Sequence, residues 1–101
     1  MSFGVEVTRR AQRDIDRAYA WYRKRSPQGA AAWHTEILAA LERLETFPHR
    51  CPMAEVETEA FGVEVRQLLC REHRILFNVE KESVFVLTVR HTKREPLGPA
   101  R

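Results

Sequence analysis

Two stretches of helical periodicity stand almost end to end in the first half of this chain, separated only by Ser26-Pro27. The first stretch places apolar side chains on one helix face at Ala11, Ile15, Ala18 and Tyr22. The second does so at Trp33, Ile37, Ala40, Leu41 and Leu44. Serine is a good N-cap and proline is tolerated at the first helical position, so a new helix starts here. Two helices with so short a connection predict an antiparallel hairpin.

Strand-like runs flank the helices. Residues 3–7 alternate apolar and small or polar side chains, and Thr8 after them can cap the first helix, which should end near residues 24–26. Phe47-Pro48 should end the second, because the residue before proline avoids helical geometry. Residues 49–61 have weak periodicity and predict mainly loop. Three further strands are predicted over 63–70, 73–80 and 84–90, with connections short enough for hairpins.

The order of these elements is β-α-α-β-β-β. It predicts an α+β fold in which a helical hairpin packs on one face of a mainly antiparallel sheet, leaving the other face partly open to water or to a partner. A chain of 101 residues has the size of one domain, which we assign to residues 1–95. Residues 96–101 contain two prolines and a glycine and should form a flexible C-terminal tail.

Several classes of protein do not fit the sequence. No apolar run approaches the roughly 20 residues of a membrane span, and the N-terminus lacks the pattern of a secretory signal, so we expect a cytoplasmic protein. Cys51 and Cys70 should then be reduced. Neither cysteine belongs to a ligand pair at zinc-like spacing, and we expect no metal and no cofactor.

Charge is unevenly distributed along the chain. Residues 1–25 carry a net charge of +4, residues 26–65 of −5 and residues 66–101 of +4, and fourteen of the 17 basic side chains are arginines. The planar guanidinium fork suits bidentate contact with phosphate or carboxylate. The pattern therefore indicates an anionic partner, either nucleic acid or an acidic protein segment. The alternative is a solvated charged surface with internal ion pairs.

A set of basic residues lies on or just after the three C-terminal strands. Neighbouring hairpin strands can bring them together, and arginines can hold phosphate while a histidine moves a proton. Arg74, within His73-Arg74-Ile75-Leu76-Phe77, has a second interpretation, an ion pair with the acidic middle segment. His73 itself is interpreted as structural, and the arginines of the first helix as solvated. The candidate binding residues are Arg66, Arg74, Arg90, His91 and Arg94.

The sequence resembles the RelE/ParE superfamily of bacterial toxins, also called plasmid stabilisation proteins. The resemblance is carried by Ala11 and Asp14-Ile15, by Trp33, Ile37 and Leu41-x-x-Leu44-x-x-x-Pro48, by Arg66-x-Leu68 and the 73–77 stretch, and by His91-x-x-Arg94. It spans nearly the whole chain in the same order. It implies the fold reached above, and a type II toxin neutralised by a cognate antitoxin in a toxin–antitoxin hetero-oligomer.

The resemblance leaves two kinds of target. RelE-like members cut mRNA in the ribosome, which would give catalytic roles to Arg66, Arg74 and His91 and make the protein an enzyme. Yet residues 63–70 contain no lysine, the only tyrosines lie in the first helix, and position 73 is histidine where the family usually has tyrosine. ParE-like members poison DNA gyrase, and the hairpin and C-terminal motif are closer to these. The main interpretation is a ParE-like gyrase inhibitor; the alternatives are an mRNA endonuclease and an inactive module that only binds its antitoxin.

Overall fold

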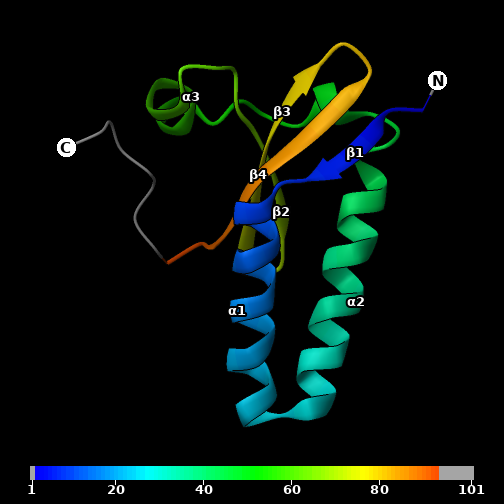
Figure 1. Cartoon of the computed structure of the whole chain (residues 1–101), viewed down its shortest axis with the longest axis vertical. Coiled ribbons are helices and arrows are strands. Elements are labelled where there is room, and N and C mark those ends of the chain that lie inside the picture. The colour runs from blue at the N-terminus through cyan, green and yellow to red at the C-terminus, as the bar shows by residue number, and fades with distance from the viewer. Residues whose placement is uncertain (1, 94–101) are drawn as a thin grey trace.

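The computed structural model describes residues 2–93. Its helices are α1 (Arg9–Arg25), α2 (Pro27–Arg43), the 3-10 turn η1 (Pro48–Arg50) and α3 (Glu55–Phe61). Its strands are β1 (Gly4–Val7), β2 (Arg66–Cys70), β3 (His73–Glu80) and β4 (Ser83–His91). They form one sheet in the order β1-β4-β3-β2, in which only β1 and β4 are parallel (Figure 1). The predicted α+β fold is confirmed.

The predicted hairpin is present, and both of its caps are confirmed. The Thr8 side chain accepts a hydrogen bond from the Ala11 amide at the start of α1, and Ser26 does the same for Gly29 at the start of α2. Figure 1 shows α1 and α2 side by side, joined by a tight turn at the end distant from β1. None of the helices within residues 2–93 is long and apolar enough to cross a membrane.

The second helix ends earlier than the sequence predicted, at Arg43 rather than near Phe47. The Leu44 amide bonds to the Leu41 carbonyl, three residues back, which tightens the last turn. The carbonyl of Glu45 then accepts a hydrogen bond of 2.8 Å from the Phe3 amide. This carbonyl is therefore bonded to the segment before β1 and not to a further turn of the helix.

The prediction of loop for residues 49–61 is wrong for its second half, which forms α3. Two acidic side chains in the first turn interact favourably with the positive end of the helix dipole. Gly62 ends the helix with a φ of 74°, a left-handed conformation that suits glycine. The helix is short, so tertiary contacts must hold it. Ala54 and Phe61 pack with Val65 and Leu76 on the face of the sheet opposite the hairpin, which is therefore partly covered.

The start of β2 also differs from the prediction, because α3 uses the backbone just before it. The Val65 amide donates to the Thr58 hydroxyl at 2.8 Å, and the Val65 carbonyl accepts from the Ala54 amide at 2.7 Å. These bonds engage both backbone groups of Val65 with α3 and with the residue that precedes it, and β2 begins at the next residue, Arg66.

The main core lies between the hairpin and the sheet. Apolar side chains from both layers form one cluster, which includes Trp33, Ile37 and Leu44 from the second helical stretch and Ile75, Phe77, Val86 and Val89 from the sheet. Burial of this apolar area is the dominant stabilising term of such a fold.

A carboxylate joins α1 to β4 where β1 ends. β1 pairs with β4 only over residues 83–86, which leaves the later part of this strand edge without a strand partner. Asp14 of α1 fills the place, since its carboxylate accepts hydrogen bonds from the Thr88 hydroxyl and, at 3.1 Å, from the Val89 amide. The helix is thereby fixed alongside the C-terminal half of β4, and this juxtaposition forms one wall of the groove described below.

Candidate functional site

The strand register divides the predicted site residues between the two faces of the sheet. Directly paired residues of an antiparallel ladder point to the same face. Arg66 pairs with Phe77 and so lies on the hairpin face, whereas Arg74 pairs with Arg90 on the opposite face. Arg74 and Arg90 are thus neighbours, but both are separated from Arg66, and the prediction that all these side chains converge into one exposed basic patch is wrong. Arg94 lies outside the described residues.

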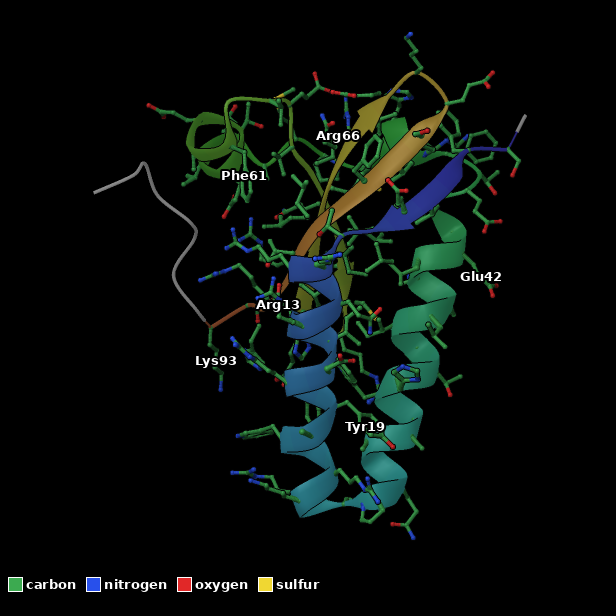
Figure 2. The ribbon with its side chains drawn as sticks, viewed as in Figure 1. Arg13, Tyr19, Glu42, Phe61, Arg66 and Lys93 are labelled. Atoms are coloured by element: carbon green, nitrogen blue, oxygen red, sulfur yellow. The ribbon has the colours of Figure 1, made fainter. Side chains whose placement is uncertain are left out.

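Arg66 is engaged by the segment that precedes β2. Its guanidinium lies 3.0 Å from the Glu64 carboxylate and donates to the carbonyls of Cys51, at 2.7 Å, and His49, at 3.2 Å. These bonds attach the 49–51 segment to the edge of the sheet, near the position at which Figure 2 labels Arg66. Arg66 thus has a visible structural role.

Arg74 forms the internal ion pair that the sequence had left as its second interpretation. Its two terminal nitrogens bond both oxygens of Glu57 on α3, at 3.1 and 3.0 Å, and its Nε donates to Gln67 at 2.8 Å. The Glu57 side chain is 1% exposed and that of Arg74 15%. A bidentate ion pair with so little exposure to solvent holds the guanidinium in place, so Arg74 is not free on an exposed surface.

Two histidines meet on the hairpin face at the other end of the strands. His73 and His91 are directly paired across β3 and β4, with ring centroids 5.2 Å apart. Trp33 Nε1 donates to Nδ1 of the buried His73 at 3.3 Å, which assigns the ring proton to Nε2. Burial, with His91 as a second cause, lowers the pKa of His73, and Glu72 opposes the shift. His73 is therefore neutral and structural, in agreement with the sequence.

His91 is partly exposed and contacts groups near the surface of the protein. Its Nε2 lies 3.4 Å from the Glu72 carboxylate, and its Nδ1 accepts a hydrogen bond of 3.1 Å from the Lys93 amide. Arg66 lies on the same face, but four residues further along the strands, about 13 Å at the usual rise. Arg66, Arg74 and His91 therefore do not form a common catalytic constellation.

A groove of about 660 Å³ opens beside His91, between α1 and the C-terminal end of β4. Ala18, Tyr22 and Val89 contribute apolar surface to it. Trp21 also lines it and is 52% exposed, with the guanidinium of Arg25 stacked 3.6 Å from its ring centre. We call this the α1–β4 groove.

The rim of the α1–β4 groove is basic. Arg17 and Lys93 line it, and Figure 2 shows Arg13 and Lys93 on the side of α1 that faces away from α2. Within residues 2–93, none of these three cations has a carboxylate in ion-pair range. From the sequence, the arginines of α1 are interpreted as solvated side chains without a binding role. Their spacing of four residues, continued by Trp21, was the signal that could have marked one row on the helix.

The described residues offer little for metal or thiol chemistry. No cluster of three histidine, cysteine or acidic side chains suited to a metal occurs within residues 2–93. Cys51 and Cys70 are free thiols, as expected. Burial raises the pKa of both, with arginines in part opposing the shift, so both stay protonated at neutral pH.

Comparison with known proteins decides the family. Residues 5–96 match the family described as "ParE toxin of type II toxin-antitoxin system, parDE". The chain belongs to the ParE toxin family. Among solved structures, a chain from the chromosomal ParDE toxin–antitoxin system of P. aeruginosa superposes with a TM-score of 0.74 at 20% identity, over 88% of this chain and 95% of that one. At this identity the likeness shows the fold alone. None of the proteins with curated descriptions matches the sequence.

Membership confirms the resemblance read from the sequence, including its closer relation to ParE-like members. This ParE-family chain is thus a toxin of the type II toxin–antitoxin kind, and the family implies a cognate antitoxin as its partner. The features that carried the resemblance have separate structural roles. Asp14 joins α1 to β4, Trp33 orients His73, and Arg74 holds α3.

Proposed function

We propose that this ParE-family toxin inhibits DNA gyrase in the cytoplasm and that its cognate antitoxin neutralises it by direct binding. The observation that carries the proposal is the match to the ParE family over residues 5–96. The geometry supports it by weakening the alternative. An mRNA endonuclease needs phosphate-binding and proton-transferring groups around one scissile bond. Here Arg74 is engaged with Glu57 on the face opposite His91.

A supercoiling assay tests the proposal. Purified toxin is titrated into gyrase, ATP and relaxed plasmid, and we expect loss of supercoiling or accumulation of cleaved DNA as the toxin concentration rises. Addition of the purified antitoxin should restore supercoiling. The same titration with heat-unfolded toxin is the control. Unchanged supercoiling at a large excess of folded toxin would contradict the proposal.

A second assay separates gyrase inhibition from the two alternatives. Primer extension on translated mRNA should show no new cuts when the toxin is present. Cuts that appear with the wild type and vanish in His91→Asn would instead support a ribosome-dependent endonuclease, whereas Arg74→Ala would confound the result because it also removes a buried ion pair. Expression without antitoxin should arrest growth, and normal growth would support the inactive binding module.

A further inference from the structure

We infer that the α1–β4 groove is the docking site for an acidic segment of the antitoxin that inserts one large apolar side chain beside Trp21. The inference rests on the proposed neutralisation by direct binding and adds the place and the chemistry of the contact. Its basis is the combination of an apolar groove, a half-exposed tryptophan and cations without ion-pair partners among the described residues.

The groove has the composition of an interface centre. Its volume of about 660 Å³ lies within the usual range of binding sites and accommodates a few side chains. Trp21 keeps half of its surface in water although Tyr22 and Val89 lie close enough to line the same hollow. Tryptophan and arginine are the residues that most often dominate binding energy at interfaces, usually at positions that become dry in the complex.

The charge of the rim selects an acidic partner. Of the two carboxylates that line the groove, Asp14 is engaged, because it accepts hydrogen bonds from Thr88 and Val89, and Glu72 lies at one end of the groove beside His91. Arg17 and Lys93 remain as charges that a partner can neutralise. Arg13 continues the row towards the start of α1, and the eight residue steps from Arg13 to Trp21 span about 12 Å. Two turns of a helix or about four extended residues reach from one end of this row to the other.

A protein segment fits the groove better than nucleic acid does. Arg25 lies over one face of the Trp21 ring and Tyr22 contacts the ring edge-on, so a stacked base would compete with these contacts, whereas an apolar side chain can pack against the exposed part of the ring. The Glu72 side chain, 68% exposed at the rim, would also repel the regularly spaced charges of a phosphate backbone, whereas a protein segment can place its carboxylates away from Glu72. A segment with spaced carboxylates and an apolar anchor avoids both conflicts. The partner implied by the family is itself a protein.

Two substitutions test the groove by different kinetic signatures. The toxin and its cognate antitoxin are purified, and their association is followed by biolayer interferometry at low and high salt. Arg17→Glu should slow association at low salt on the order of tenfold and reduce its salt dependence, because rim charges act mainly through steering. Trp21→Ala should raise the dissociation rate about 30-fold, as expected for an interface anchor.

Arg23→Glu is the matched control. Arg23 is exposed on the same helix, changes the net charge equally and does not line the groove, so its association rate should stay within about twofold of the wild type. Circular dichroism checks that each variant is folded. The fluorescence of Trp21 supplies a second readout, since binding should shift its emission to the blue and Trp21→Phe should abolish the shift.

The outcomes separate the groove from the proposed function. In one outcome the wild-type complex forms, but its kinetics change equally in Arg17→Glu and Arg23→Glu and do not change in Trp21→Ala. This result overturns the assignment of the groove as the docking site and leaves the gyrase assay unaffected. Absence of any wild-type complex overturns both the groove and neutralisation by direct binding. Arg17-dependent binding of single-stranded or duplex oligonucleotides, with unchanged antitoxin kinetics, would assign the groove to nucleic acid and also overturn the inference.

Discussion

Replacement of Arg74 by methionine tests whether the pair with Glu57 is a structural anchor of α3. Methionine keeps most of the length of the side chain and removes the charge. The variant takes both guanidinium donors away from a carboxylate that is 1% exposed. α3 has only seven residues and depends on tertiary contacts, so this loss acts directly on its attachment to the sheet.

The expected cost follows from the burial of the two partners. Breaking a buried ion pair by removing one partner costs about 3–5 kcal/mol, a large part of the 5–15 kcal/mol that stabilises a typical domain. Glu57→Gln should cost less, about 1–3 kcal/mol, because the charge that remains belongs to Arg74, whose long stem and 15% exposure let it approach water. The double variant Arg74→Met/Glu57→Leu should recover most of the loss.

Urea unfolding followed by circular dichroism measures these free energies. Arg71→Met is the control, because Arg71 also pairs with a carboxylate, that of Glu36, but has a side chain 62% exposed and should lose at most about 1 kcal/mol. If Arg74→Met costs no more than Arg71→Met, burial does not govern the strength of these pairs and the structural account of Arg74 is refuted. A double variant as unstable as Arg74→Met alone would refute it as well.

Three further substitutions test other features. Asp14→Ala removes the acceptor of the Thr88 hydroxyl and the Val89 amide and should cost about 2–3 kcal/mol in urea unfolding, whereas Asp16→Ala, exposed on the same helix, should cost about 0.5 kcal/mol or less; equal losses would contradict the role of Asp14. Lys81 has a φ of 54°, so Lys81→Gly should stabilise by about 0.5–1 kcal/mol and raise the melting temperature while Lys81→Ala does not, and a gain in both would point to another cause. Burial lowers the pKa of His73 below 6.5, so as the pH falls the unfolded chain binds a proton at this histidine before the folded protein does. The free energy of unfolding should therefore decline below about pH 6.5. In His73→Phe this free energy should decline less steeply, and an unchanged slope would show that another group controls it.

The sequence predicted those parts of the fold that local chemistry controls. Thr8 and Ser26 cap the two long helices because their side chains bond within the same turn, and short links between apolar runs produced the hairpins. α3 was missed because its seven residues have no periodicity of their own. It exists through contacts to Val65 and Leu76, which lie beyond it in the chain.

The site was harder to predict than the fold, because it depends on strand register. The alternation within each strand does not by itself show whether Arg66 and Arg74 lie on the same face of the sheet. That answer requires the pairing between the two strands. The register places Arg74 over the acidic segment and Arg66 towards the hairpin. The cations that do share a surface come from α1 and from the end of β4, and their proximity depends on the bonds of Asp14 to β4.

The parallel pairing of β1 with β4 has a consequence for how the toxin is made. Residues 4–7 are synthesised before the helical hairpin, but their partners at 83–86 follow only 79 positions later in the chain. Until then the nascent chain has no finished sheet for its hairpin to cover, and contacts of such long sequence separation slow folding further. The folded sheet can therefore form only after β4 has been synthesised, which leaves time for a partner protein to meet the chain while it folds.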